Sequence, residues 1–321
     1  MAELVESILQ LLVTGVLVGS IYGLMCTGLG MIFSVIRVIN FAQGEFMTLG
    51  MYATFFVGAG LTTYALLDPT VATYLAIGAA SVVLAVAGWF VQTLVVAHVS
   101  GSRGATVAGG NESEGHFAQL ILTLGLSLVI SNTALILFGS SSRTVQTPLA
   151  TASWVLGPFT SGDITLFVNK ARLVGAVVAA GVSLLLWLFV QRTRAGMAMR
   201  AAADRPGAAT IVGINTERAF AGAFAIGIGA TAVAGGLLAT YYPFNPYTGF
   251  EFVITMYAGV VLGGMGSLLG AFWGGFTIGI VQQMSTFVLP FQLQNATVFL
   301  LFLLVVLLRP QGFFGRSAER T

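Results

Sequence analysis

Residues 191–218, QRTRAGMAMRAAADRPGAATIVGINTER, form a polar, small-residue segment between two long apolar runs, and carry five of the chain's thirteen Lys and Arg residues. Arginine at the ends of apolar spans marks the cytoplasmic face of a membrane, so we interpret this segment as a cytoplasmic loop. The good helix formers of 195–203 predict one short helix. Pro206 suits the first turn of a second helix, for which we expect Asp204 as N-cap and Gly213 as the stop. The sequence therefore predicts a compact two-helix element suited to docking on another protein.

The composition of the whole chain is that of an integral membrane protein. Of its 321 residues, 57% are hydrophobic and only 7% are charged, whereas a soluble domain has roughly 25% charged residues. The apolar runs are long enough for helices of about 20 residues and do not alternate as the strands of a membrane barrel would. We predict an all-α, polytopic transmembrane helix bundle of about eight or nine spans, forming a single domain over residues 1–321. The few basic residues lie at loop ends, so we expect no nucleic-acid partner.

Alternation of the spans about the loop 191–218 fixes the expected orientation. The candidate spans are 8–35, 44–66, 71–98, 119–139, 171–191, 219–241, 252–267, 268–289 and 295–309. With the loop inside, the N-terminus lies outside and the C-terminus inside, and ten basic residues face the cytoplasm against three outside: Arg143, Lys170 and Arg172. This bias supports the orientation. The first span is long for one upright crossing, so we expect it to tilt or break near Gly28 and Gly30. The short seventh span could be re-entrant.

Polar residues cluster where the first span ends. Asn40, Gln43 and Glu45 fall within six residues between two apolar runs. If this segment lies within the membrane, these groups must face protein or a water-filled cavity, which makes them candidates for a translocation path or gate. The alternative is an ordinary turn at the membrane interface.

Three connecting segments outside the spans have distinct compositions. Residues 100–116 are Gly-rich without an apolar face and read as a flexible linker. Residues 140–170 form the largest external segment and could dock an external partner. The Tyr-rich residues 241–247 favour an interfacial anchor over a docking role.

Glycines recur four residues apart from Gly259 onward, a spacing that lets helix backbones approach closely in lipid. The residues expected to pack in this way are Gly263, Gly264, Gly266, Gly270 and Gly274.

A short internal similarity links Glu45-Phe46 and the residues after it with Glu251-Phe252. Inverted repeats are common in transporters, but so short a match also arises by chance.

The chemistry of an energy source is missing from the sequence. The only lysine, Lys170, follows Asn169, so no GxxxxGK[ST] phosphate loop can be written. The two histidines have no metal-ligand spacing, and we expect no catalytic residue, no metal and no cofactor in this chain.

Uncharged polar residues in or beside the spans could bond neighbouring helices or line a solute path: Gln92, Asn132, Gln282, Gln283 and Asn295. A path and a docking element without an ATP site favour the membrane subunit of an importer whose ATPase is a separate chain. The alternatives are a stand-alone channel or secondary transporter and, more distantly, a membrane enzyme.

Six segments carry a resemblance to a known family. They are Gly19-Ser-Ile-Tyr-Gly23, Ile39-Asn-Phe-Ala-Gln-Gly-Glu-Phe46, Gly196-Met-Ala-Met-Arg-Ala-Ala-Ala-Asp204, Gly213-Ile-Asn215, Leu262-Gly-Gly-Met-Gly-Ser-Leu-Leu-Gly-Ala271 and Arg309-Pro-Gln-Gly-Phe313. In this order, across nearly the whole chain, they resemble the first of the two permease types of branched-chain amino-acid ABC importers. Close relatives of that family import urea, short amides and other small molecules, so the substrate is less specific than the family.

This resemblance implies a bacterial or archaeal cytoplasmic-membrane importer working by alternating access. Its expected partners are a second homologous permease, two ATPase subunits that hold ATP and Mg²⁺, and an extracytoplasmic solute-binding protein. It also implies that the loop 191–218 couples to an ATPase through Arg200, Ala203, Asp204 and Gly213. The family's Asn-Phe-Ala-His-Gly-Glu segment corresponds to residues 40–45, and Gln43 stands where many members have histidine.

Overall fold

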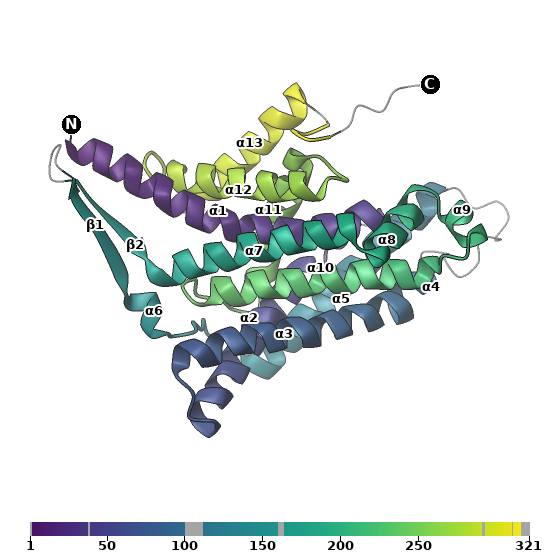
Figure 1. Ribbon diagram of the computed structural model, residues 1–321, viewed down its shortest axis with the longest axis horizontal. Helices are drawn as coiled ribbons and strands as arrows, with labels where there is room; N and C mark the ends of the chain where they lie inside the picture. Colours follow the sequence, from purple (N-terminus) through teal and green to yellow (C-terminus); the bar gives the residue numbers. More distant parts are fainter. Residues whose placement is uncertain are drawn as a thin grey trace.

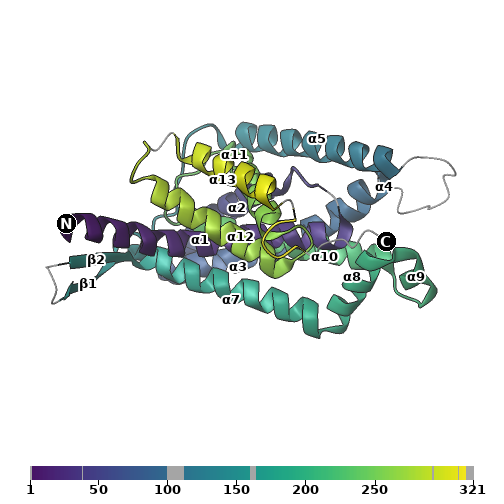
Figure 2. The ribbon, with the colours of Figure 1, turned by 90° about the horizontal axis from the view of Figure 1, so that it is seen from above.

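The computed structural model describes residues 2–37, 39–99, 112–159, 164–290, 293–309 and 311–315. Its long helices lie side by side along one axis of the molecule (Figures 1 and 2). They are α1 (Ala2–Ile36), α2 (Gln43–Tyr64), α3 (Pro69–Val91), α5 (Glu112–Phe138), α7 (Lys170–Arg192) and α10 (Thr216–Ala239). Three further apolar helices follow: α11 (Thr248–Gly263), α12 (Leu268–Ser285) and α13 (Gln294–Leu308). Shorter elements are the π-helix η1 (Gln92–Val96), α4 (Ala97–Val99), α6 (Pro148–Thr151), α8 (Arg194–Asp204) and α9 (Pro206–Ile211).

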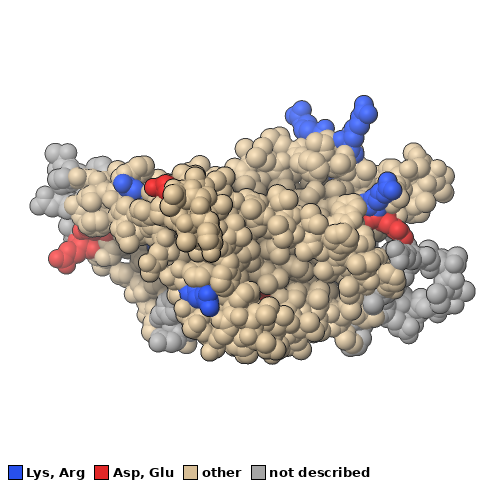
Figure 3. Space-filling model, turned by 90° about the horizontal axis from the view of Figure 1, so that it is seen from below, with Lys and Arg blue, Asp and Glu red and all other residues tan. Residues whose placement is uncertain are grey.

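The helices confirm the predicted all-α membrane bundle. Within the described residues, six are long and apolar enough to cross a membrane. The expected spans at 252–267, 268–289 and 295–309 correspond to α11, α12 and α13. Helix α11 begins and ends four residues earlier than predicted, α12 ends four residues earlier, and α13 is displaced by one residue. In Figure 3 the charged side chains lie toward the two ends of the long axis, and most of the surface between them carries none. This distribution suits a bundle whose middle lies in hydrocarbon.

Helix α1 runs without a break through Gly28 and Gly30. Its 35 residues correspond to about 52 Å, more than the roughly 30 Å of a hydrocarbon core. The extra turns lie at the N-terminal end of α1. There the Gln10 amide donates to the Phe167 carbonyl at 2.8 Å and accepts from the Phe167 N–H at 2.9 Å. The first turns of α1 therefore bind a neighbouring strand, and no break is needed.

That strand belongs to a two-stranded antiparallel hairpin that the sequence did not predict. β1 (Ser153–Phe159) pairs with β2 (Ile164–Asn169), with Ser153 opposite Asn169. Both strands lie in the segment 140–170, which was expected to be external. The hairpin extends from the end of the bundle at which α1 begins, and α8 and α9 lie at the opposite end (Figure 1).

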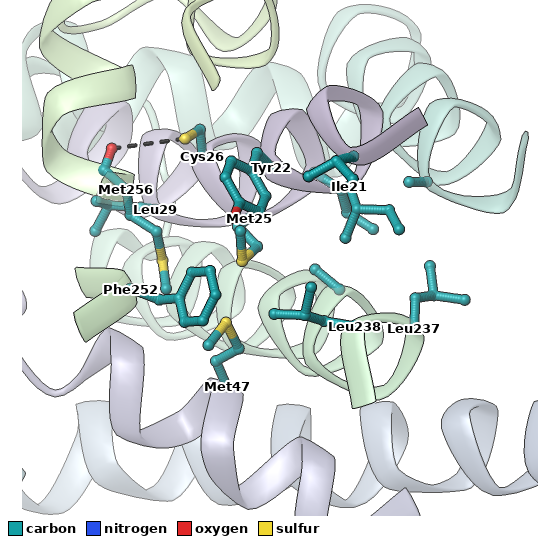
Figure 4. Close-up of a cluster of buried hydrophobic side chains, with 14 of the residues drawn as sticks. Ile21, Tyr22, Met25, Cys26, Leu29, Met47, Leu237, Leu238, Phe252 and Met256 are labelled. Atoms are coloured by element: carbon teal, nitrogen blue, oxygen red, sulfur yellow. Dashed lines mark hydrogen bonds between the residues drawn. The ribbon is translucent and has the colours of Figure 1, made fainter. Parts of the chain in front are cut away.

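The core gathers side chains from helices that are far apart in the sequence. Figure 4 shows Met25 and Leu29 of α1, Met47 of α2, Leu237 of α10 and Phe252 of α11 converging in one cluster. The Cys26 thiol is fully buried there, 3.6 Å from the Met256 carbonyl oxygen. This shared core fixes α1, α2, α10 and α11 relative to one another.

The expected linker at 100–116 is only partly described. Residues 100–111 lie outside the described residues, and α5 begins at Glu112. The last five residues of the predicted linker, 112–116, are therefore helical, contrary to the prediction.

Candidate transport and coupling sites

The loop 191–218 folds into the two short helices predicted for it. Helix α8 begins after Thr193, whose hydroxyl accepts a hydrogen bond from the Gly196 N–H at 3.1 Å. Pro206 opens α9, but the predicted cap was one residue early: Asp204 ends α8, and Arg205 is the N-cap of α9 without a side-chain hydrogen bond. The predicted stop is correct, because Gly213 follows α9 with a φ of +92°, which favours glycine.

Helix α8 is attached to the bundle by one apolar face. Met199 and Ala202 are buried in a cluster with Met31 and Val35 of α1 and Ala223 of α10. A second link holds the helix to the end of α7, because the Arg200 guanidinium donates to the Gln191 amide oxygen at 3.0 Å. A force on α8 therefore reaches α1, α7 and α10 directly.

The four residues expected to couple to an ATPase occupy different environments. Arg200, Asp204 and Gly213 are exposed. Ala203 is half-buried and packs against the cluster under α8.

Two apolar residues at the tip of the element were not among the candidates. Ile211 is 88% exposed and Val212 is 81% exposed, just before the turn at Gly213. Their signal in the sequence is an apolar pair inside an otherwise polar loop. Exposed adjacent apolar side chains at the end of a protein commonly mark a protein contact.

The polar segment after α1 is buried within the bundle. Asn40 and Gln43 are 0% exposed and Glu45 is 2% exposed. The Asn40 amide donates to the Gln43 side-chain oxygen at 3.1 Å, and the Gln43 amide donates to the Thr231 hydroxyl at 2.5 Å. Thr231 lies within α10, away from both of its ends. The segment is therefore bonded to protein inside the membrane-spanning part of the bundle, as buried polar groups in lipid require.

Helix α5 faces this segment with a polar stripe that sequence reasoning missed. Gln119, Thr123, Ser127 and Ser131 recur every four residues and are all buried, so they lie on one face of the helix. The Ser127 hydroxyl donates to a carboxyl oxygen of Glu45 at 3.3 Å.

Two further bonds of the stripe fasten α5 at other levels. The Thr123 hydroxyl donates to the Ile39 carbonyl at 3.2 Å, and the Ser131 hydroxyl donates to the Pro246 carbonyl at 3.4 Å. The opposite face of α5 carries exposed apolar side chains, such as Leu128 at 64%. Polar groups therefore fasten this helix to the bundle while apolar groups point outward, and Figure 2 shows α5 along one edge of the molecule.

The expected packing glycines divide into two kinds. A Cβ on Gly263 would collide with the Gly270 carbonyl, and a Cβ on Gly274 would collide with the Gly259 carbonyl, so these glycines bring α11 and α12 into backbone contact. Gly264 and Gly266 instead lie in the turn between the helices, with φ of +100° and +101°. Gly266 has no neighbour for a Cβ within 4 Å, so its contribution is backbone conformation rather than packing.

The segment after α13 closes on this turn. The Phe313 N–H donates to the Leu262 carbonyl at 2.9 Å, and the Phe314 N–H donates to the Gly263 carbonyl at 3.1 Å. The Arg309–Phe313 motif thus holds the end of α11.

No group of three or more His, Cys, Asp or Glu residues within the described ranges is placed to hold a metal ion.

Comparisons with known proteins cover almost the whole chain. The family model described as the permease component of the branched-chain amino acid transport system matches residues 11–308. The chain is 32% identical over 318 residues to the high-affinity branched-chain amino acid transport system permease protein LivH of Escherichia coli, with 98% of each chain covered. It is 32% identical over 310 residues to the corresponding protein BraD of Pseudomonas aeruginosa, with 96% of each chain covered. A probable branched-chain amino acid transport permease protein LivH of Methanocaldococcus jannaschii is 26% identical over 300 residues, covering 91% of this chain and 88% of that relative.

Proposed function

Because the chain belongs to the family of branched-chain amino acid transport permease components, we propose that it is the transmembrane permease subunit of an ATP-binding-cassette importer. Its solute is a branched-chain or other small amino acid, or a related small polar molecule such as urea or an amide. The solute passes from a binding protein outside to the cytoplasm. The chain itself contributes translocation rather than catalysis.

The observation that carries this proposal is the α8–α9 element. It ends in the exposed pair Ile211 and Val212 and is bonded at its base to helices that cross the whole bundle. An element with an apolar tip and a rigid base suits transmission of movement from a separate protein. We assign the tip to a groove of an ATPase subunit, with Arg200, Ala203, Asp204 and Gly213 shaping the element behind it.

The buried polar segment is the proposed gate. Gln43 accepts a hydrogen bond from Asn40 and donates one to Thr231 of α10, and Glu45 accepts one from Ser127 of α5. Relative movement of α10 and α5 must therefore break or exchange these bonds. Movement of α8 reaches α10 through the cluster around Met199. Closure of the ATPases would therefore change the bonding at the gate and switch the path from one side to the other.

The remaining parts of the importer are separate chains. The partners are a second homologous permease, two ATPase subunits that bind ATP and Mg²⁺, and an extracytoplasmic solute-binding protein. In the cytoplasmic membrane, α8, α9 and the C-terminus face the cytoplasm, and the N-terminus and the hairpin face outward. The excess of arginine around α8 and α9 favours this orientation.

The test is assembly in the chain's own host. Tagged wild-type chain, purified in mild detergent, should bring along two ATPases and a second permease. Ile211→Asp with Val212→Asp should lose the ATPases, because two charges replace the apolar tip, and should keep the second permease. The matched control is Leu66→Asp, since Leu66 is 87% exposed and lies in the turn between α2 and α3. Recovery of the ATPases with the tip variant at the wild-type level would remove α8–α9 as their docking site.

A further inference from the structure

A mixed-charge cavity lies among the helix ends on the hairpin side of the bundle. Its volume is about 490 Å³, within the range of roughly 300–1,000 Å³ of small-molecule sites. It is bounded by the start of α7, the end of α10, the first turns of α11 and α13, the last turn of α12, and α1. The lining residues are Val18, Tyr22, Arg172, Leu238, Tyr241, Tyr242, Glu251, Phe252, Thr255, Gln282, Gln283, Thr286, Gln294 and Asn295.

The lining carries one full charge of each sign. Arg172 is its only Lys or Arg residue, and Glu251 is its only Asp or Glu residue. Among the described residues no ion pair joins Arg172 to Glu251. A site of this kind fits a solute that is positive at one point, negative at another and neutral as a whole.

The two charges lie beside adjacent tyrosines. The Arg172 guanidinium stands over the Tyr241 ring, 5.1 Å from its centre. Burial raises the pKa of Tyr241, and Arg172 opposes that shift. Burial and the nearby Glu251 carboxylate both raise the pKa of Tyr242. Arg172 of α7 therefore lies near Tyr241 and Glu251 of α11 near Tyr242, so two opposite charges from different helices lie beside adjacent residues of one loop.

The rest of the lining supplies neutral polar groups and an apolar wall. The Gln282 amide donates to the Asn295 side-chain oxygen at 3.1 Å, which ties α12 to α13 across the cavity. The Tyr241 hydroxyl is buried and has no hydrogen-bond partner among the described residues, although buried polar groups are normally bonded. Val18, Leu238 and Phe252 provide the apolar surface, with the rings of Phe252 and Tyr242 edge to face at 5.4 Å.

We propose that this cavity is a binding site for the zwitterion of an aliphatic α-amino acid. Arg172 binds the α-carboxylate, because guanidinium and carboxylate form strong charge-assisted hydrogen bonds. Glu251 binds the α-ammonium group, and the side chain lies against Val18, Leu238 and Phe252. The inference rests on the proposed function and deepens it, since it names the residues that receive the solute before it reaches the buried gate.

Protection of an introduced thiol measures occupancy of the cavity directly. Thr286→Cys and Thr255→Cys place a thiol in the lining, and the native Cys26 is 0% exposed and so does not react. In the complete complex in proteoliposomes, millimolar L-leucine should slow labelling by a small thiol reagent at least threefold. Neither 3-methylbutylamine, which lacks the carboxylate, nor 4-methylpentanoate, which lacks the ammonium group, should protect.

Charge-removing variants assign the protection to the two named residues. Arg172→Gln or Glu251→Gln should abolish protection by L-leucine. Arg143→Gln should keep it, because Arg143 stands over the rings of Phe55 and Phe56 and is not in the cavity lining. Tyr64→Cys, on a side chain that is 89% exposed, should be labelled equally with and without leucine.

ATP-driven uptake by the same vesicles separates the two proposals. Uptake without protection at either cysteine, or equal protection by all three solutes, would overturn the zwitterion site and leave the importer intact. Absence of ATP-driven uptake by the wild-type complex would overturn both.

Discussion

At the residue scale, stability depends on glycines that allow backbones to touch. Gly274 lies against the Gly259 carbonyl, whereas Gly181 in α7 has no atom within 4 Å of a Cβ position. We expect Gly274→Ala to lower the free energy of unfolding by ~1–3 kcal/mol through overpacking. Gly181→Ala should instead raise it by ~0.5–1 kcal/mol, because alanine favours helix. Thermal unfolding of the two purified variants checks this. If both variants unfold at a higher temperature than the wild type, the α11–α12 contact tolerates a methyl group.

Sequence spacing identified this contact but not all of its residues. Gly263 lies four residues after Gly259, Gly274 lies four residues after Gly270, and all four approach another backbone. Gly264 and Gly266 have the same surroundings in the sequence, yet they form the turn. Spacing reports which residues share a face only while the helix continues, and α11 ends at Gly263, four residues before the predicted end at residue 267.

At the element scale, buried hydroxyl groups bond α5 to the bundle beside the apolar packing of Leu122, Leu126 and Ile130. Ser127→Ala should leave the buried Glu45 carboxyl without its donor, an effect of ~1–3 kcal/mol, and should lower both the unfolding temperature and solute uptake. Asn132→Ala is the matched control, since Asn132 is exposed and donates within its own helix to Leu128. Similar losses in the two variants would mean that the bond between α5 and α2 does not matter to transport.

The elements differ in how far the sequence could predict them. The α8 and α9 helices follow from strong helix formers, Pro206 and Gly213, all of which act locally. The hairpin was missed because β1 contains Gly157 and Pro158, and because β2 depends on a neighbouring helix, as the bonds between Gln10 and Phe167 show. The polar stripe of α5 was missed because in lipid the buried face of a helix can be the polar one, the reverse of a soluble helix.

At the scale of the whole molecule, the orientation in the membrane can be read by labelling. Leu66→Cys lies in the turn between α2 and α3, and Ile211→Cys lies at the tip of α9; both native side chains are at least 87% exposed. In intact cells a membrane-impermeant thiol reagent should label residue 66 at once and residue 211 only after the membrane is opened. The reverse pattern would place α8 and α9 outside and exclude a cytoplasmic ATPase as their partner.

The fold of the whole molecule was largely predictable from the sequence, whereas the contacts among the polar residues proposed to form the solute path were not. Long apolar runs with arginine at their ends determine the number and direction of the main helices. Which polar residues meet depends on tertiary packing: Gln43 finds Thr231 and Glu45 finds Ser127, partners more than 80 residues away. No local pattern in a single sequence encodes such pairs.

The proposed function requires that this chain moves its solute only as part of an ATP-driven complex. The most direct measurement is uptake of radiolabelled L-leucine into proteoliposomes that contain this chain, its second permease and its ATPases, with the binding protein outside. Under the proposed function, leucine accumulates only when the ATPases have ATP and Mg²⁺, and accumulation stops when the tip variant at Ile211 and Val212 replaces the wild-type chain. Leucine flux through the purified chain alone, without ATP or partners, would rule out the importer and identify a channel or secondary carrier.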